Sequence, residues 1–252
     1  MKKIKRIDYS NEPSRDLLCI DVKSFFASVE AVERGIHPLE SMIAVVSKPN
    51  IQGGLILASS PKVKERYGIN TGSRVFELPY KSDIQVVEPR MSLYLDKNME
   101  IMRIFKQFVA TEDLYPYSID EAFLDVTASK RLFGHPHEIA LKIQKEIWNK
   151  LGLIVTIGIG DNPLLAKLCL DHQAKKDQKN SFIGEWRYRD VPQTVWKIRP
   201  LSEFWGIGSR REAAFERMGI TTIFKLSQSD PTRLKAIMGV LGGTILFPCS
   251  WY

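Results

Sequence analysis

The chain has 252 residues, of which 44% are hydrophobic and 26% charged, a balance that excludes wholesale disorder and is typical of a folded globular protein. Lysine and arginine number 36 against 29 acidic residues, so the net charge is +7. This excess favours an acidic partner, of which nucleic acid is the first expectation, although a mildly basic enzyme that binds no polyanion would carry the same charge.

The first half of the chain is predicted from its apolar periodicity. A short strand at 17–20 ends in Asp21, and a helix at 24–30 follows it. We then expect strands at 42–46 and 55–58, a short basic helix at 62–67 closed by Gly68, and a longer helix at 92–110. The residues that this longer helix is expected to bury are Met91, Tyr94, Leu95, Met99, Met102 and Phe105.

The second half continues with a strand that opens at Asp120 and Glu121, and then with a helix, a strand and a helix, at 138–151, 155–159 and 162–173. Asn162 is the expected cap of the last helix, with Pro163 just inside it. The charged run 175–180 indicates a linker and a domain boundary, although its lysines could also follow a DNA strand. These elements predict an α+β fold.

The cysteines and the hydropathy pattern point to the cell interior. The three cysteines are widely spaced and include no C-x-x-C, which argues against a disulfide scaffold or a zinc knuckle. No apolar run approaches the roughly 20 residues that a membrane span needs. We therefore predict a cytoplasmic protein without membrane contact.

Three acidic residues stand at the ends of predicted strands. Asp21 closes the first strand, and the adjacent Asp120 and Glu121 open a later one. Acids at strand ends can converge across a sheet, and three carboxylates with open coordination positions suit Mg²⁺ rather than zinc, with the main-chain carbonyl of Val22 as an extra ligand. Two such ions would clamp an in-line phosphoryl displacement. The alternative, which spacing does not exclude, is that these acids are solvated caps and turns.

Two segments carry a more specific signal: 19–30 (CIDVKSFFASVE) and 117–126 (YSIDEAFLDV). They resemble the two catalytic motifs of Y-family translesion DNA polymerases. Further matches lie at 68–72, 156–160, 165–167 and 205–208, in family order. Within the family, the chain looks most like the UmuC-like proteins of Gram-positive bacteria, the UvrX type.

The resemblance implies a particular domain arrangement. A palm with a central mixed or antiparallel sheet would comprise 1–24 and 91–177, a fingers domain 25–90, and a helix-hairpin-helix thumb 178–243. On this resemblance, the little finger with which the family grips DNA is expected to be absent. The match fades after Gly243, and 244–252 is expected to be a frameshifted or truncated tail.

The resemblance also implies roles for individual residues near the acids. Asp21, Asp120 and Glu121 match the catalytic metal ligands, with the main-chain oxygen of Val22, for two Mg²⁺ ions that Mn²⁺ could replace. Phe26 matches the steric gate, whose ring occupies the space of a ribose 2′-hydroxyl, and Phe25 lies beside it. Outside the family context, Phe26 would be interpreted as a core aromatic.

The nucleotide-binding positions depart from the family pattern. Segment 58–66 lacks the tyrosine and arginine that many relatives direct at the incoming triphosphate, so Ser59, Lys62 and Lys64 are the candidate replacements. Pro163 takes the place of a lysine, and Lys167, one helical turn later, is a further candidate. Lys23 stands where many relatives have a second aspartate.

A helix–turn–helix is predicted over 201–219, around Trp205-Gly206-Ile207-Gly208. Backbone N–H groups at the start of the second helix would suit a phosphate, and Arg210 and Arg211 add positive charge there. Gly206, Gly208, Arg210 and Arg211 are therefore the expected DNA contacts. The alternative is an ordinary αα-hairpin whose glycines merely permit the turn.

The expected activity is template-directed DNA synthesis of the translesion type, in DNA repair and SOS damage tolerance. A primer 3′-hydroxyl would attack the α-phosphate of a dNTP and pyrophosphate would leave. Damaged primer-template DNA, dNTP and a sliding clamp or other SOS proteins are the expected partners. Two alternatives stay open: a truncated remnant that binds damaged DNA or a polymerase partner without productive synthesis, and a cyclase-like palm enzyme acting on free nucleotides.

Overall fold

The computed structural model describes residue 9, residues 12–230 and residues 232 and 234. The predicted tail at 244–252 lies outside these residues, as does the end of the predicted thumb. By its internal contacts the chain divides into two compact units, residues 19–157 and residues 1–18 with 158–252. The palm, fingers and thumb boundaries inferred from the sequence differ from this division and stay predictions. Among the described residues, every helix is too short or too polar to cross a membrane.

The predicted strands and helices occur in the predicted order, with most boundaries within one or two residues, and short elements at 85–87, 114–116, 130–133 and 183–186 are additional to the prediction. They are β1 (Leu17–Val22), α1 (Phe25–Val32), β2 (Ile43–Val46), β3 (Ile56–Ser59), α2 (Pro61–Tyr67), β4 (Gln85–Val87), α3 (Met91–Phe105), β5 (Leu114–Pro116), β6 (Glu121–Asp125), α4 (Lys130–Phe133), α5 (Pro136–Leu151), β7 (Val155–Gly160), α6 (Pro163–His172), β8 (Ile183–Trp186), α7 (Ser209–Arg217) and α8 (Ile223–Ser227).

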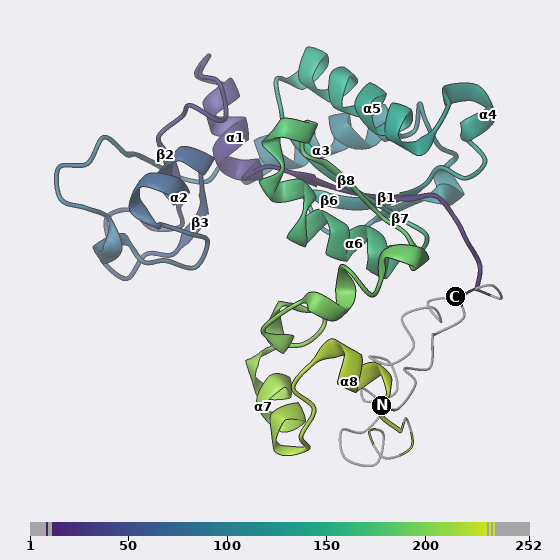
Figure 1. Ribbon diagram of the computed structural model, residues 1–252. Helices are drawn as coiled ribbons and strands as arrows, with labels where there is room; N and C mark the ends of the chain where they lie inside the picture. Colours follow the sequence, from purple (N-terminus) through teal and green to yellow (C-terminus); the bar gives the residue numbers. More distant parts are fainter. Residues whose placement is uncertain (1–8, 10–11, 231, 233, 235–252) are drawn as a thin grey trace. The chain divides into compact units, whose positions relative to one another are not determined.

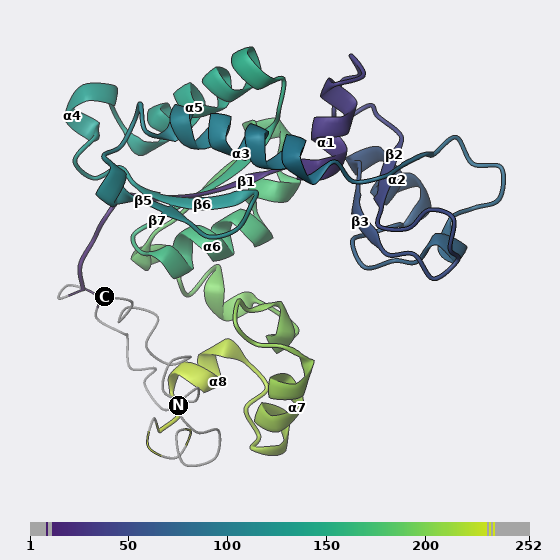
Figure 2. The ribbon, with the colours of Figure 1, turned by 180° about the vertical axis from the view of Figure 1, so that it is seen from behind.

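The larger sheet has the strand order β5-β6-β1-β7-β8, and it confirms the α+β class. Strand β7 is buried along its whole length and β1 along nearly all of it, as expected for apolar runs in central strands. Strands β5 and β6 pair antiparallel, with Tyr115 opposite Phe123. Helices α3 and α5 contact each other and lie along one face of this sheet (Figures 1 and 2).

Helix α3 corrects one prediction about the core. Tyr94 and Phe105 are buried as expected, but Met91, Leu95 and Met99 are about half exposed, and Ile101 and Ile104 are buried in their place. The helix carries two apolar stripes, roughly 100° apart around its axis. Packing against α1 and α5 selects the stripe that contains Tyr94. The helix also ends at Phe105, five residues earlier than predicted.

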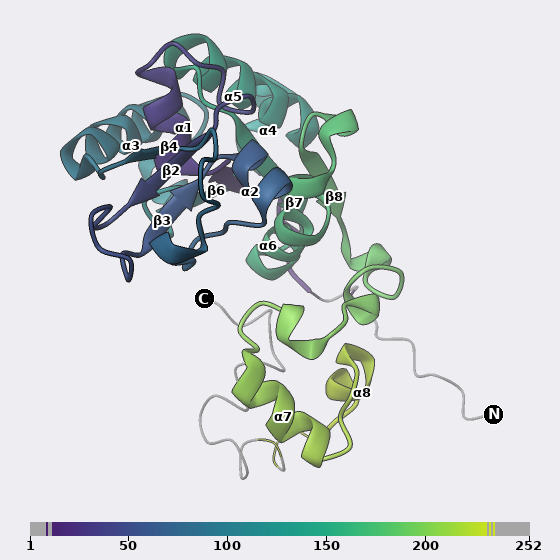
Figure 3. The ribbon, with the colours of Figure 1, turned by 90° about the vertical axis from the view of Figure 1, so that its left-hand side faces the viewer.

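A smaller sheet has the order β3-β2-β4 (Figure 3). Strand β2 pairs antiparallel with β3, with a bulge after Val45, and parallel with β4. The side chains of β2 alternate, so Ile43 and Val45 pack against α1, whereas Ala44 and Val46 pack against Val63 of α2. Helix α2 begins at Pro61, one residue before its predicted start, and is closed by Gly68 with φ of 69°, as predicted.

Helix α6 begins as predicted, with the Asn162 side chain accepting the N–H of Leu165 at 2.8 Å. It packs directly on β7. A Cβ atom added at Gly158 or Gly160 would come within 2.4 Å of the α6 backbone, so this approach requires glycine. The charged run after α6 forms two short 3₁₀ helices that lead to β8.

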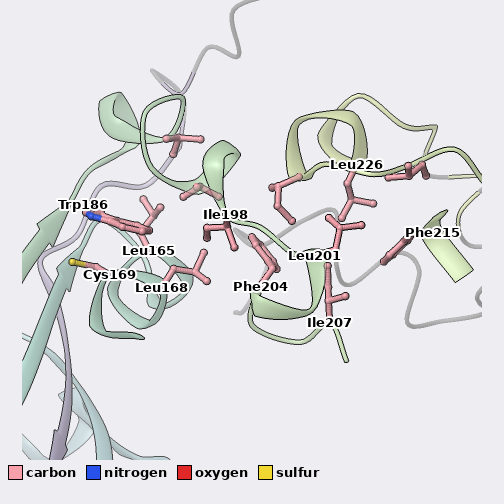
Figure 4. Close-up of a cluster of buried hydrophobic side chains, with 14 of the residues drawn as sticks. Leu165, Leu168, Cys169, Trp186, Ile198, Leu201, Phe204, Ile207, Phe215 and Leu226 are labelled. Atoms are coloured by element: carbon pink, nitrogen blue, oxygen red, sulfur yellow. The ribbon is translucent and has the colours of Figure 1, made fainter. Parts of the chain in front are cut away.

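The region after β8 has an apolar cluster of its own (Figure 4). Phe204, Ile207 and Phe215 from the turn and α7 pack with Leu226 of α8, and the cluster extends to Leu165 and Leu168 of α6. The predicted hairpin differs in its first helix, which is a single 3₁₀ turn at Leu201–Glu203. Pro200 precedes this turn and Gly206 follows it closely, which leaves no room for a longer helix.

Candidate active site

The end of β1 and the beginning of β6 are hydrogen-bonded neighbours. The N–H of Val22 donates to the carbonyl oxygen of Asp120 at 2.9 Å. Asp21 and Val22 on one strand therefore lie beside Asp120 and Glu121 on the other. The structure thus brings the backbone positions of all three sequence-predicted acids together, although about a hundred residues separate the two motifs.

The local contacts hold each acid differently. Glu121 is buried, and the thiol of Cys19 donates to its Oε1 at 3.2 Å. Asp120 is half-buried, and the hydroxyl of Ser118 donates to its Oδ1 at 2.7 Å. The carbonyl oxygen of Asp21 accepts the hydroxyl of Thr156 on β7 at 3.3 Å. The strand end that carries Asp21 is therefore hydrogen-bonded to β6 on one side and to β7 on the other.

These residues carry the oxygen ligands that a hard cation prefers. Carboxylate and main-chain oxygens are the ligands that Mg²⁺ prefers, and Asp120 and Glu121 present two carboxylates beside the Asp21–Val22 strand end. Within the described part of the chain, no group of three or more His, Cys, Asp or Glu side chains is arranged at metal-binding spacing. The fit therefore rests on donor type and on adjoining strand ends rather than on a formed cage.

The ring of Phe26 lies against the ring of Tyr94 from α3. The two rings are stacked, with centroids 4.3 Å apart and planes 15° apart. Phe25 is buried and meets Tyr94 edge-on, at 6.3 Å. Sequence reasoning placed Tyr94 in the core but missed it as the partner of Phe26, since nothing in the local pattern relates α1 to α3.

Buried beside these rings, Glu30 is a further residue that the sequence analysis missed. Its carboxylate accepts hydrogen bonds from Arg90, Arg34 and the hydroxyl of Tyr94. Burial by itself would raise the pKa of Glu30, but these hydrogen bonds outweigh it and the pKa is lowered below the ordinary 4.5. The sequence did carry a signal for Glu30, because this residue falls on the apolar face of the helix predicted at 24–30. A carboxylate that is buried on such a face needs a cation as its partner.

Of the candidate triphosphate contacts in segment 58–66, Lys64 is hydrogen-bonded to the first acidic motif: its Nζ donates to the hydroxyl of Ser24 at 2.9 Å. Lys62 is paired with Glu40 at 2.7 Å. Ser59 is fully buried and its hydroxyl donates to the carbonyl of Ile69 at 2.8 Å. This contact gives the Ser59 hydroxyl a structural role, which argues against the predicted nucleotide contact at this residue.

The remaining predicted residues lie in the other compact unit and are described separately. Lys167 is buried in α6, where its Nζ lies 3.2 Å from Oδ2 of Asp171. In the turn before α7, Gly206 adopts φ of 89° and Gly208 is the residue that caps the helix. Arg211 donates to the carbonyl of Gly206, whereas Arg210 is exposed at the start of the helix.

Comparison with known proteins agrees with this geometry. Residues 20–171 match the model of the impB/mucB/samB family, so the chain belongs to that family. This match confirms the resemblance to Y-family polymerases that the motifs suggested. The chain is 46% identical to UvrX of Bacillus subtilis (strain 168) over 241 residues, which is 96% of this chain and 56% of UvrX.

Two further comparisons bear on the fold and the family. DNA polymerase IV 2 of Bacillus subtilis (strain 168) is 36% identical over 90% of this chain and 53% of its own length. A solved insertion ternary complex of Dbh DNA polymerase has the same fold, with a TM-score of 0.77 at 24% identity over 93% of this chain and 67% of that one. The chain thus spans little more than half the length of UvrX and of DNA polymerase IV 2.

Proposed function

We propose that this chain carries out template-directed DNA synthesis of the translesion type, extending a primer 3′ end with dNTP. The observation that carries the proposal is the hydrogen bond between Val22 and Asp120, which sets the two acidic motifs side by side. Membership in the impB/mucB/samB family and 36% identity to a DNA polymerase IV support it.

Each part of the site has a role in this proposal. Asp21, Asp120 and Glu121, with the main-chain oxygen of Val22, would hold two Mg²⁺ ions, or Mn²⁺ in their place. When bound, such ions activate the attacking hydroxyl and neutralise charge on the transferring phosphoryl group. Asp120 would be aimed by Ser118, and Glu121 by Cys19.

Substrate contacts come from the flanking elements. The ring of Phe26, with Phe25 behind it, would exclude a ribose 2′-hydroxyl. Lys62, Lys64 and Lys167 are the proposed triphosphate contacts. The turn at Gly206 and Gly208, with Arg210 and Arg211, would bind DNA phosphates without reading sequence, as a template-directed enzyme requires.

The proposed setting is DNA repair. Damaged primer-template DNA and dNTP are the proposed substrates, and a sliding clamp or other SOS proteins are the proposed partners. We expect the proposed DNA synthesis to take place in the cytoplasm.

The test is primer extension with Mg²⁺ by the wild type, Asp120→Ala and Asp125→Ala. Asp125 is the matched control, because it lies at the far end of β6, where its Oδ1 accepts the N–H of Thr127 at 2.9 Å. We expect Asp120→Ala to lose about a thousandfold in rate, since it removes charge stabilisation in the transition state, and Asp125→Ala to retain extension.

Other outcomes decide between the proposal and its alternatives. Unchanged extension by Asp120→Ala would contradict the metal assignment. A wild type that binds primer-template but never extends it would favour a binding role without synthesis. Product formed from GTP or ATP without DNA would favour a cyclase-like enzyme.

A further inference from the structure

The carboxylate of Glu30 is fully buried, at the point where α1 faces the start of α3. Arg90 binds both of its oxygens, through Nε at 3.0 Å and Nη2 at 2.7 Å, and Arg34, two residues after the end of α1, binds one of them. Such a bidentate arginine contact fixes the plane of the carboxylate as well as its position. Glu30 is therefore a rigid acceptor inside the protein.

Tyr94 connects this acceptor to Phe26. Its hydroxyl donates to Oε1 of Glu30 at 2.7 Å, and its ring lies stacked on the Phe26 ring with centroids 4.3 Å apart. The edge contact with Phe25 restricts the same ring from another side. A tyrosine side chain has two rotatable bonds before its ring, so a hydrogen bond at its far end and contacts on its faces leave it a single orientation.

Phe26 is held less firmly on its own. Unlike Phe25 it is partly exposed; one side packs against a buried cluster that includes Ala31 and Val45, and its ring stacks on Tyr94. The cluster supports Phe26 from one side, and the stacked face is held by Tyr94, whose own orientation depends on Glu30. These contacts connect a buried ion pair to a partly exposed aromatic ring.

We propose that Tyr94 and Glu30, with Arg90, are positioning residues that hold the Phe26 ring in place and thereby set the discrimination between deoxyribonucleotides and ribonucleotides. The inference rests on the proposed function, because it takes Phe26 as the group that meets the sugar. It adds that the selectivity resides in a four-residue assembly across α1 and α3. Neither Tyr94 nor Glu30 needs to contact the nucleotide.

The physical reason lies in how a steric exclusion works. A ring excludes a 2′-hydroxyl only if it cannot move aside, and a shift of well under 1 Å at such a contact changes the energy steeply. Removing the Tyr94 hydroxyl leaves the stack but frees one end of it, and also leaves one oxygen of the buried Glu30 with fewer donors. Ribonucleotides then gain access to the site, while the use of deoxyribonucleotides changes little.

The experiment compares kcat/KM for dCTP and for CTP in primer extension by the wild type, Tyr94→Phe, Glu30→Gln and Tyr67→Phe. Tyr67 is a matched control, because its hydroxyl donates to Asp83 at 2.8 Å and Arg66 binds the same carboxylate, but the group over its ring is the guanidinium of Arg66 rather than an aromatic side chain. We expect the dCTP-over-CTP ratio to fall about tenfold in Tyr94→Phe and in Glu30→Gln, the equivalent of one buried hydrogen bond. Tyr67→Phe should keep the wild-type ratio.

A second measurement does not depend on turnover. With 4-fluorophenylalanine at position 26, the ¹⁹F resonance reports the environment of that ring. We expect a changed or broadened resonance in Tyr94→Phe and an unchanged one in Tyr67→Phe. Thermal unfolding of each variant shows whether it is folded at the assay temperature.

The two hypotheses fail in different ways. A wild type without extension would overturn the proposed polymerase function, and the ¹⁹F signal would then decide the positioning inference by itself. A wild type that extends and discriminates, together with a Tyr94→Phe variant of unchanged ratio and unchanged resonance, would overturn the positioning inference and leave the polymerase proposal standing.

Discussion

The thiol of Cys19 lies 3.2 Å from Oε1 of Glu121, with both side chains buried. Cys19 and Asp21 are two residues apart on β1, so both side chains project from the same face of the strand. One face of β1 therefore carries a predicted catalytic acid and the group that contacts a second acid on β6. The contact ties the two motifs together by a side chain as well as by the backbone.

A change at Cys19 should alter the response to Mg²⁺. We expect Cys19→Ala to lower primer extension about threefold to tenfold and to raise the half-saturating Mg²⁺ concentration, because Glu121 loses a weak donor. Cys19→Ser, which keeps a donor, should stay near wild type. The control is Cys169→Ala, since Cys169 is buried in α6 with its pKa raised by burial to about 12. Equal Mg²⁺ dependence in all variants would exclude an orienting role for Cys19.

Arg187 should be a strong stability determinant. Its guanidinium is largely buried and contacts Asp16 at 2.8 Å, Asp161 at 3.0 Å and Glu185 at 2.7 Å. Arg187→Met would leave buried carboxylates without their cation, at a cost of about 3–5 kcal/mol in the free energy of unfolding, measured in urea. Arg189→Met is the control, because Arg189 is 84% exposed, and we expect less than about 0.5 kcal/mol. Similar losses in both variants would argue against the buried network.

The lowered pKa of Glu30 predicts a dependence of stability on pH. A carboxyl group whose pKa is lower in the folded protein stabilises the fold above its unfolded value, near 4.5, and this contribution is lost as the pH falls through the folded pKa. The difference in melting temperature between wild type and Glu30→Gln should therefore be constant above about pH 5.5 and should narrow below 4.5. A difference that stays constant down to pH 3 would refute this assignment.

Arg210 and Arg211 should contribute to DNA binding in different ways. Arg210 is exposed at the start of α7, so Arg210→Ala should weaken primer-template binding and reduce the slope of log affinity against log salt by about one. Arg211 donates to the carbonyl of Gly206, so Arg211→Ala should also loosen the turn and lower the melting temperature. Arg217→Ala, at the far end of α7, is the control. An unchanged salt slope in Arg210→Ala would remove that residue from the proposed interface.

Local features of the fold were predictable because their causes are local. Asn162 and Pro163 mark the start of α6, and Gly68 ends α2 in a left-handed conformation, through contacts within a few residues. The continuous apolar runs of β1 and β7 identify central strands. Asp21, Asp120 and Glu121 were candidates because they stand at the ends of predicted apolar strands, and the resemblance of their two motifs to Y-family polymerases distinguished them from solvated turn residues.

Tertiary structure decided which of these features meet. Pairing of β1 with β6 placed Val22 beside Asp120, and no pattern within either motif specifies that pairing. Both stripes of α3 are apolar in sequence, and packing decided between them by exposing Leu95 and burying Ile101. The same packing turned Tyr94 toward Phe26 and Glu30. Contacts between residues far apart in the chain depend on the relative placement of whole elements, and that placement is fixed only when their surfaces are buried together.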